Sequence, residues 1–512
     1  MSMPKKVRVT VILQPSGKST VLIVNNENID DLLKQCSSKL KVKARRLFIS
    51  TTGIELTSFN ASTLLSDDLK IIVTSGNQYT INNSSATDGA TSIDHVPETE
   101  QLNSHPAIVR IIARDTLIDQ SAIDQLNNVA KLYRGVKYVI GMPDLHAGQS
   151  TPIGSVVASE EFIYPELIGT DIGCGMSFIR TNLKSCRLTD KKLLKWVKQL
   201  NGLDDNLGED VINQYLKQDL QWPMGINVER VENDISDEYD IYNQQLGTIG
   251  GGNHFAELQE IEQVLDKEAF SKLGLDMDCL YLLVHSGSRS LGEAILRKYS
   301  SGSSVKGLRV ETDEYRRYMK LHDTACAWAK RNRSLIAKRF LSYLGCSTED
   351  DEDETVDNAE YQCIVDIWHN NVVLKRFNED GGENLYLHRK GACPSDQGCV
   401  VIPGSRGTRS YLVQPIVEKQ EYSGYSLAHG AGRVWSRTKA RQQLSERYPN
   451  AKQLQRTDLN SHVICDDKNL LYEEAPQCYK DIDVIIQDLV DFELVKVIAI
   501  MKPLITYKMR EK

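Results

Sequence analysis

Residues 169–178, GTDIGCGMSF, decide how most of this chain is interpreted. They place a carboxylate, Asp171, three residues before a thiol, Cys174, with glycines on either side. Glycine is common in tight turns because it adopts positive φ, so the two side chains could be accidental neighbours. The same spacing suits two metal ligands, because glycines let the backbone approach an ion closely and a bound metal deprotonates a thiol. The rest of the sequence has to decide between these interpretations.

Histidines provide the next evidence. Several of them stand beside glycine, asparagine or serine rather than within apolar stripes, and they lie in MPDLHAG (His146), GGGNHFAEL (His254), LLVHSGSRS (His285), IWHNN (His369) and SLAHGAGR (His429). A single histidine is more often a hydrogen-bonded core or surface group than a ligand. Several on strand ends and glycine-rich loops, together with Asp171 and Cys174, favour a metal centre. The mixed ligand set admits Mn, Zn, Co or Fe.

Composition excludes some classes of protein. The chain has 512 residues, of which 41% are hydrophobic and 25% charged, as is ordinary for globular proteins. The net charge of −8 does not indicate nucleic-acid binding, so such binding requires a local patch. The 11 cysteines form no C-x-x-C pair and are expected to be reduced thiols. Neither a signal sequence nor a membrane-spanning stretch is recognisable, so we expect a cytoplasmic or nuclear protein without membrane contact.

Two domains and a linker are expected. Residues 1–78 alternate like strands in KVRVTVIL, STVLIV, RRLFIS and LKIIVT, and IDDLLKQCSSKL has helical spacing. This order resembles the ubiquitin-like β-grasp fold and implies a binding module, although an accessory domain that adds only stability is equally consistent. Residues 79–104 are rich in Ser, Thr, Asn and Asp, which is typical of a polar, flexible linker.

Residues 105–512 are expected to form one large α+β domain. Apolar runs such as VKYVIGM, LYLLVHS and CVVIPG alternate with helical segments such as TDKKLLKWVKQL. Within this domain the motifs become recognisable. MPDLHAG, PELIGTDIGCGM, GGGNHFAE, HSGSR, HRKGA, IPGSRGTRSY, AHGAGR, EEAPQCYKDID and MKPLITYK resemble, in order, the motifs of the RtcB family of RNA ligases. Within the family, the sequence is most similar to the release factor H-coupled subgroup.

The resemblance implies a GTP- and Mn²⁺-dependent ligase that joins an RNA 3′-phosphate, or a 2′,3′-cyclic phosphate, to a 5′-hydroxyl in RNA repair or tRNA splicing. It also implies that Asp171 and Cys174 are metal ligands, with the thiolate bridging two Mn²⁺ ions. His254 would complete the coordination of one ion. His285 and His369 would complete that of the other.

The same resemblance implies that His429 attacks the α-phosphate of GTP and carries GMP. Neutral imidazole is a competent nucleophile near pH 7, and its phosphoramidate is labile enough to pass the nucleotide onward. Asp144 in MPDLH would orient His429, although Asp144 could equally be a turn residue. The remaining carried-over contacts are, for GTP, Asn253, His254, Phe255, Ala256, Glu257, His369, Asn370, Pro403, Gly404, Ser405, Arg406, Ser410, His429, Gly430, Ala431, Gly432 and Lys508, and for RNA, Arg289, Arg389 and Arg433.

Glu257 and Lys508 would distinguish guanine from adenine, because a carboxylate accepts from guanine N–H groups and an ammonium donates to its O6. Arg406 and Arg409 depart from the usual family pattern. They would bind additional phosphates of a structured RNA, or pair with nearby acids such as Asp396.

Two other functions remain open from the sequence: a metal-dependent RNA-end phosphoesterase that does not seal, and a non-catalytic adaptor that recruits a partner through its ubiquitin-like domain. The expected partners are RNA with broken ends, from tRNA or rRNA, an archease-like activator, and an unknown protein that binds the ubiquitin-like domain. Covalent labelling with GTP separates these functions, because only the ligase traps GMP.

Overall fold

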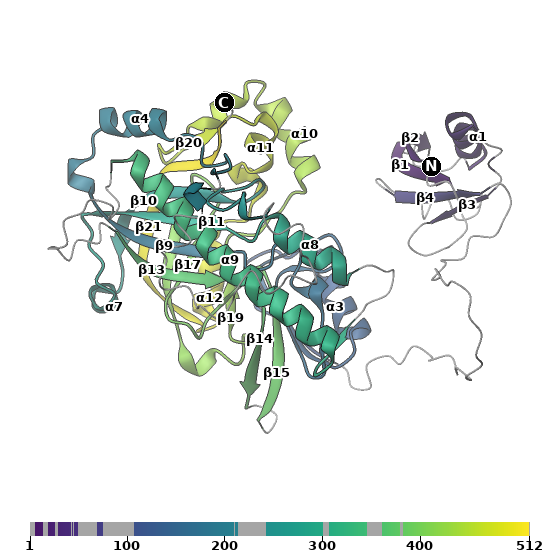
Figure 1. Ribbon diagram of the computed structural model, residues 1–512, viewed down its shortest axis with the longest axis horizontal. Coiled ribbons are helices and arrows are strands. Elements are labelled where there is room, and N and C mark those ends of the chain that lie inside the picture. The colour runs from purple at the N-terminus through teal and green to yellow at the C-terminus, as the bar shows by residue number, and fades with distance from the viewer. Residues whose placement is uncertain are drawn as a thin grey trace. The chain divides into compact units, whose positions relative to one another are not determined.

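The computed structural model describes residues 6–13, 19–25, 29–41, 44, 46–49, 69–74, 107–208, 210–212, 242–300, 307–345, 361–378 and 382–510 (Figure 1). By its internal contacts the chain divides into two compact units, of which the first covers residues 1–97. The predicted linker, residues 79–104, lies outside the described residues. No helix among the described residues is long and apolar enough to cross a membrane.

The N-terminal unit is a four-stranded mixed sheet with one helix. Its elements are β1 (Lys6–Leu13), β2 (Ser19–Asn25), α1 (Ile29–Leu40), β3 (Arg46–Ile49) and β4 (Leu69–Thr74). The strand order is β2-β1-β4-β3, with β1 parallel to β4 and the other pairs antiparallel. Alternate residues of β1, Val7, Val9 and Val11, pack with Leu32 and Cys36 of α1 in a separate small core. The strands and the helix therefore form where the periodicity of the sequence predicts them.

The C-terminal unit is built on two larger sheets. An eight-stranded sheet has the order β13 (Tyr361–Trp368), β9 (Gly175–Lys184), β11 (Cys279–Ser286), β10 (Phe255–Val264), β21 (Val495–Met509), β18 (Ser410–Pro415) and β17 (Val400–Pro403), and β20 (His462–Cys465) pairs parallel with β21. A five-stranded sheet has the order β14 (Asn370–Phe377), β15 (Glu383–Lys390), β7 (Ile153–Ser159), β6 (Val136–His146) and β5 (Ile108–Ile111). Two-stranded pairs join β8 (Phe162–Ile163) to β12 (Leu308–Arg309) and β16 (Ala392–Pro394) to β19 (Ser426–Ala428).

Helices cover these sheets. The described helices of this unit are α3 (Gln120–Leu132), α4 (Asp190–Gln199), α7 (Lys267–Lys272), α8 (Ser290–Tyr299), α9 (Asp313–Tyr343), α10 (Arg437–Arg447), α11 (Lys468–Glu473) and α12 (Ile482–Asp491). The 31-residue α9 crosses β9, β10 and β11 and packs Ile336 and Phe340 against the eight-stranded sheet (Figure 1). The mixed architecture confirms the expected α+β class.

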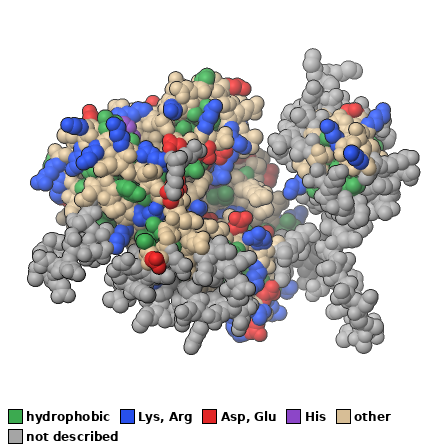
Figure 2. Space-filling model, turned by 45° about the horizontal axis from the view of Figure 1, so that its top comes forward, with side chains coloured by type: hydrophobic (Ala, Val, Ile, Leu, Met, Phe, Trp, Pro, Cys, Tyr) green, Lys and Arg blue, Asp and Glu red, His purple; other side chains and the backbone are tan. Residues whose placement is uncertain are grey.

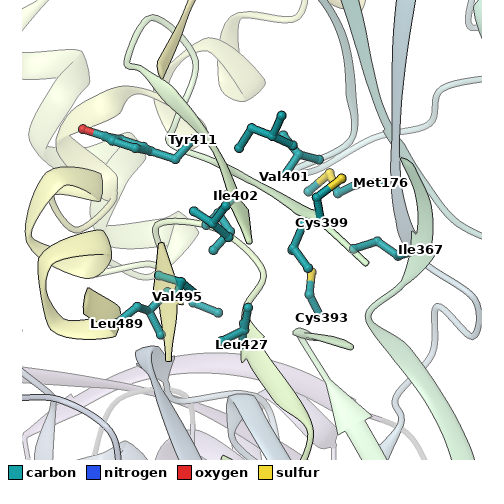
Figure 3. Packing of buried hydrophobic residues seen from close by; sticks show 14 of the residues in the cluster. Met176, Ile367, Cys393, Cys399, Val401, Ile402, Tyr411, Leu427, Leu489 and Val495 are labelled. Carbon is teal, nitrogen blue, oxygen red and sulfur yellow. The ribbon is translucent and has the colours of Figure 1, made fainter. Parts of the chain in front are cut away.

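The other face of the eight-stranded sheet packs toward α12 and the five-stranded sheet in one large core. Figure 3 shows part of this core, where Met176 and Ile367 lie near Val401 and Cys399. Side chains alternate along each strand, so residues two apart share a face. Three runs place their last member on this inner face at the strand end: Phe178, Met176 and Cys174; Tyr281, Leu283 and His285; Val365, Ile367 and His369. The fold thus collects chemically active side chains between the two sheets.

Candidate active site

Five side chains predicted as metal ligands form one cluster, in which Asp171 is half-buried and the other four are buried. The first ligand set consists of Asp171, Cys174 and His254, and the second of Cys174, His285 and His369. Within each set the potential ligand atoms all lie within 4.8 Å of one another. Cys174 belongs to both sets, so a thiolate there would bridge two ions.

The distances within the sets are short. His254 Nε2 lies 2.8 Å from Asp171 Oδ2 and 3.4 Å from Cys174 Sγ. Cys174 Sγ lies 3.2 Å from His285 Nε2, which is 3.3 Å from His369 Nε2. Ligand atoms that share an ion at about 2.0–2.3 Å lie roughly 3–4 Å apart, so both sets fit a cation.

Glycines permit this close assembly. Gly173, between Asp171 and Cys174, has a φ of +75°, and a Cβ there would lie 2.7 Å from the Cα of Cys326 in α9. A Cβ on Gly287 would lie 2.2 Å from Asp171 Oδ1. Only glycine fits both positions, because any side chain would collide with α9 or displace the carboxylate. The glycines in the DIGCG and HSGSR motifs are therefore needed to form the cluster.

Electrostatics favour the metal-binding forms of His285, His369 and Asp171 but oppose that of Cys174. Burial and the neighbouring His369 lower the pKa of His285, and burial and His429 lower the pKa of His369, which keeps both imidazoles neutral. Although burial opposes it, His254 lowers the pKa of Asp171, which remains a carboxylate. Burial and Asp171 raise the pKa of the Cys174 thiol, so its thiolate needs the positive charge of a bound cation.

His429 stands beside the second ligand set, with its ring centroid 4.9 Å from that of His369. It follows β19 in the glycine-rich stretch HGAG. Asp144, fully buried at the end of β6, accepts hydrogen bonds from the His429 backbone N–H at 3.1 Å and from its Nδ1 at 2.6 Å. A proton on Nδ1 leaves the lone pair on Nε2, the arrangement of an activated nucleophile. The structure thus pairs the two residues predicted as catalytic.

A cavity of about 190 Å³ opens beside His429. Its lining comes from the ends of both sheets and from the loops after β17 and β19: His146, Ile153, Met176, Asn253, Phe255, His285, Pro403, Gly404, Ser405, Arg406, His429, Gly430, Ala431, Gly432, Arg433, Arg437, Glu474, Tyr479, Thr506 and Lys508. Most of the residues predicted to contact GTP are therefore together in one cavity.

Cations outnumber anions in the cavity wall. Arg406 and Lys508 are buried there, and burial lowers the pKa of each. Arg406 donates through Nη2 to the Leu471 carbonyl, while its buried Nη1 has no hydrogen-bond partner among the described residues. Glu474 is the buried acid of the wall, and it accepts from Arg433 Nη1 at 3.1 Å. The wall is suited to bind an anion.

Several predicted GTP contacts lie behind this wall. Glu257 is buried and accepts hydrogen bonds from Thr506 and Gln259, and burial raises its pKa to about 7. Ser410 accepts from the same Gln259. Asn370 accepts from the backbone of Gly391 and donates to that of Asp171, which braces the ligand cluster. The side chain of Ala256 points to the opposite face of the sheet, into the core beneath α9.

The three arginines predicted to contact RNA have different environments. Arg433 lines the cavity. Arg289 has its backbone N–H 3.3 Å from Asp171 Oδ1, next to the first ligand set. Arg389 is buried in β15, where it donates to Ser426 Oγ and the Tyr425 carbonyl, and it does not line the cavity.

The two unusual arginines also differ from each other. Arg409 pairs with Glu262 on the surface. It therefore does pair with an acid, as one of the two alternatives expected, but the partner is Glu262 and not Asp396. Asp396 instead pairs with Lys375. Arg406 faces the cavity and forms no salt bridge within the described residues. The proposed pairing with Asp396 is therefore wrong for both arginines.

Among the wall residues that sequence reasoning missed, three have ionisable side chains: Arg437, Glu474 and Tyr479. Glu474 and Tyr479 belong to EEAPQCYKDID, a motif that was noticed without a role being assigned to it. His146, noticed as a candidate, lines the cavity with Nδ1 2.9 Å from the Asp144 carbonyl, and burial lowers its pKa to about 4. It lies outside both ligand sets.

Comparison with known proteins gives consistent matches. Residues 125–509 match the family model described as tRNA-splicing ligase RtcB. The chain is 40% identical over 403 residues to RNA-splicing ligase RtcB2 of Escherichia coli (strain ATCC 25922), covering 78% of this chain and 96% of that relative. It is 29% identical over 455 residues to the tRNA-splicing ligase RtcB of Methanococcus maripaludis, covering 76% and 91%. It is 30% identical over 457 residues to the tRNA-splicing ligase RtcB of Thermococcus kodakarensis, covering 77% and 93%.

Proposed function

This chain belongs to the RtcB family and is an RNA ligase, and from this premise we propose that it joins RNA 3′-phosphate or 2′,3′-cyclic phosphate ends to 5′-hydroxyl ends with GTP and two Mn²⁺ ions. The observation that carries the proposal is the Asp144–His429 pair, held between an anion-binding cavity and a two-site ligand cluster.

In the first step, Nε2 of His429 attacks the α-phosphorus of GTP. A P–N bond forms, the bond between the α-phosphorus and the bridging oxygen breaks, and pyrophosphate leaves. Asp144 holds the Nδ1 proton and stabilises the positive charge that develops on the ring. A 2′,3′-cyclic phosphate would first be hydrolysed, water breaking its P–O2′ bond to leave a 3′-phosphate. The 3′-phosphate then takes the GMP as the P–N bond to His429 breaks, and the 5′-hydroxyl attacks the phosphorus of the former 3′-phosphate and displaces GMP to form the phosphodiester.

Two Mn²⁺ ions held by the first and second ligand sets would stabilise the negative charge that develops on the phosphates in each transfer. The donor set of one carboxylate, one thiolate and three imidazoles fits them. The chain itself contributes by shielding the ligands from solvent and by holding the His429 ring in contact with the ring of His369.

The cationic wall would bind the phosphates and select the base. Arg406 has an N–H group to offer to a phosphate, a charge-assisted hydrogen bond. Lys508 would donate to guanine O6, and Phe255 lies with its ring centroid 6.0 Å from the Lys508 ammonium. Glu257 would accept from guanine by exchanging its hydrogen bond with Thr506 or Gln259 for one with the base. The other predicted contacts, Asn253, Ser405 and Gly430, lie in the same wall.

Local basic surface would guide the RNA despite the net charge of −8. The helix α4 carries Lys191, Lys195 and Lys198 on exposed positions. Figure 2 shows Lys and Arg side chains gathered toward the left of the C-terminal unit, the side where α4 lies in Figure 1. Arg433 and Arg289 would contact RNA phosphates nearer the reacting ends.

We further propose that the N-terminal unit is a ubiquitin-like β-grasp domain that binds a separate protein, and that the chain belongs to the release factor H-coupled subgroup. Its substrates would be broken tRNA or rRNA in the cytoplasm or nucleus, with an archease-like activator. We also propose that the N-terminal domain comprises residues 1–78 and the ligase domain residues 105–512, with a linker between them.

Uptake of labelled GTP tests the mechanism. Wild-type protein with Mn²⁺ should form an acid-labile, base-stable adduct on His429, more readily from GTP than from ATP, and His429→Ala should form none. Peptide mapping locates the label. His322→Ala, which removes a buried histidine of α9 outside both ligand sets, is the matched control and should be labelled.

Equal labelling of wild type and His429→Ala, or a label on lysine, would contradict the histidine mechanism even if sealing occurred. Cleavage of cyclic phosphates without any adduct would favour the phosphoesterase. A protein that neither labels nor processes RNA ends would favour the adaptor.

A further inference from the structure

Two adjacent polar residues of α9, Asn332 and Arg333, are completely buried beneath the ligand cluster. A buried guanidinium and a buried amide are costly unless their hydrogen-bonding groups are satisfied. Here the partners are not other helices but the loops that carry the metal ligands. Both side chains contact Ser286, and each also contacts segments that the other does not.

Arg333 binds the segments of the second ligand set. Its Nη1 donates to the carbonyls of Gly173 and Ser286, each at 3.0 Å. Gly173 directly precedes Cys174, and Ser286 directly follows His285. Through Nε and Nη2, Arg333 also donates to Asp366 Oδ1 at 2.9 and 2.6 Å, on the strand that leads to His369.

Asn332 binds the segments around the first ligand set. Its Oδ1 accepts from the Gly247 N–H at 2.8 Å, and its Nδ2 donates to the Thr248 carbonyl at 3.2 Å. The next residue, Ile249, accepts a hydrogen bond at 3.1 Å from Nδ1 of His254. This contact fixes the ring so that Nε2 faces Asp171.

The same amide holds the loop against which Asp171 rests. Asn332 Nδ2 donates to Ser286 Oγ at 3.0 Å and to the Gly287 carbonyl at 3.2 Å. Gly287 lies against the carboxylate of Asp171, and Ser286 Oγ donates to the Ile249 carbonyl at 2.8 Å. Asn332 therefore connects both sides of the first ligand set.

Charge is balanced in this arrangement. A lone guanidinium next to a site for two cations would repel them, but Arg333 forms a salt bridge with Asp366 at 2.6 Å. The pair contributes hydrogen bonds without net charge. This arrangement suits residues that orient ligands and do not take part in the reaction.

We propose that Asn332 and Arg333 are positioning residues for the metal centre, Asn332 for the first ligand set and Arg333 for the second. The inference rests on the proposed function in assuming that the cluster binds two Mn²⁺ ions. Neither residue belongs to a ligand set or lines the cavity. Of the two, only Asn332 holds the segment of Gly247 and Thr248 that leads to the acceptor of His254. Only Arg333 holds Asp366 on the strand that leads to His369.

The test is calorimetric titration of the full-length protein with Mn²⁺ alone, in backgrounds that leave one ligand set intact. In His254→Ala only the second set is complete, so adding Arg333→Lys should weaken Mn²⁺ binding about 10- to 100-fold and adding Asn332→Ala less than about threefold. In His369→Ala only the first set is complete, and the two effects should be exchanged. If Asn332→Ala does not fold, Asn332→Asp takes its place in the test, because Asp has nearly the same size and lacks the donating amide.

The matched control is Ile336→Ala, which opens a cavity one turn along the same helix and removes no hydrogen bond to a ligand segment. It should lower the thermal midpoint and leave Mn²⁺ affinity unchanged. If wild type binds two Mn²⁺ ions and the Asn332 and Arg333 variants bind them like the control, or weaken both sets equally, the inference is overturned. If wild type binds no Mn²⁺, the proposed metal centre itself fails.

Discussion

The ligand cluster and the cavity beside it meet at His429 but have opposite electrostatic character. The cluster gathers potential ligand atoms from Asp171, Cys174 and three histidines, and each of these residues lies within 3.4 Å of at least one other. The cavity wall presents N–H groups of cationic side chains such as Arg406 and Lys508. Among the described residues that line it, Glu474 is the single acid, so its negative charge does not balance their positive charges.

The difference shows that the two regions suit ligands of opposite charge. The cluster is built for cations and the cavity for an anion, and a metal-bound nucleoside triphosphate supplies both. The two regions can therefore be disrupted separately, and the following experiments do so in order of decreasing expected effect.

Cys174→Ser should disrupt the cluster most severely. A hydroxyl stays neutral where both ligand sets need a bridging anion, so sealing activity should fall by at least about 1,000-fold, or about 4 kcal/mol. The fold should persist, because the replacement is nearly isosteric. Sealing assays at micromolar Mn²⁺ measure the effect, with Cys399→Ser, a buried core thiol outside the cluster, as the control. Full activity of Cys174→Ser would remove this residue from the metal site.

Arg406→Gln should disrupt the cavity and spare the cluster. Losing one charge-assisted hydrogen bond to phosphate costs about 1.5–3 kcal/mol, so GTP affinity should fall about 10- to 100-fold while Mn²⁺ affinity stays unchanged. Arg409→Gln is the control from the same loop, because Arg409 pairs with Glu262 away from the cavity. Similar GTP binding by both variants, measured by calorimetry, would show that Arg406 does not contact the nucleotide.

Glu257→Gln should change the pH dependence of stability. Burial raises the pKa of Glu257 to about 7 from its ordinary value of 4.5. Between these values the unfolded chain ionises this carboxyl and the folded protein keeps the proton, so its stabilising contribution, complete below pH 4.5, is lost as pH rises through 7. The loss is about 3 kcal/mol at most.

Thermal midpoints at pH 5 and pH 8 measure this effect. The wild type should lose several degrees more than Glu257→Gln over this interval. Glu260→Gln, which removes an acid paired with Lys502 on the same strand, should behave like wild type. If the thermal midpoint of Glu257→Gln falls between pH 5 and pH 8 by as much as that of wild type, Glu257 is ionised in the folded protein despite its burial.

Deleting residues 1–100 should have the smallest effect on both regions. Every residue of the cluster and of the cavity belongs to the C-terminal unit, and the N-terminal unit has a core of its own. Guanylylation and sealing of a short RNA should change less than twofold. A truncated protein that folds but takes up no GMP would place the N-terminal unit in the active site.

The sequence was informative where local pattern determines position. Cys174, His285 and His369 each end an alternating apolar run, so their common face follows from the period of a strand. The glycines around Asp171 indicated close approach, and Gly173 and Gly287 show where it occurs. The residue types and their places beside glycine-rich loops therefore indicated a metal centre, whereas the assignment of these residues to two ligand sets came from the resemblance to the RtcB family.

Long-range packing could not be predicted in this way. Arg333 lies in AKRNRSLIAKR, where charged residues at helical spacing are normally solvent-exposed, yet it is fully buried. Its burial depends on the carbonyls of Gly173 and Ser286 and on the carboxylate of Asp366, which belong to three segments distant in sequence. Glu257 likewise lies on the inner face of the sheet, as strand alternation predicts. Its carboxylate, however, accepts hydrogen bonds from Thr506 and Gln259 behind the cavity wall, and the sequence pattern does not predict these partners.

The strand β21 has a consequence for biosynthesis. It pairs with β10, β18 and β20, all of which precede it in the chain, and it carries Lys508 into the cavity. While the ribosome is still translating residues before Val495, β10 and β18 have no strand between them, and the cavity lacks part of its wall. A nascent chain therefore contains every residue of both ligand sets, the last of which is His369, well before it contains the whole cavity wall. In the proposed mechanism, GTP would bind only after this strand has emerged.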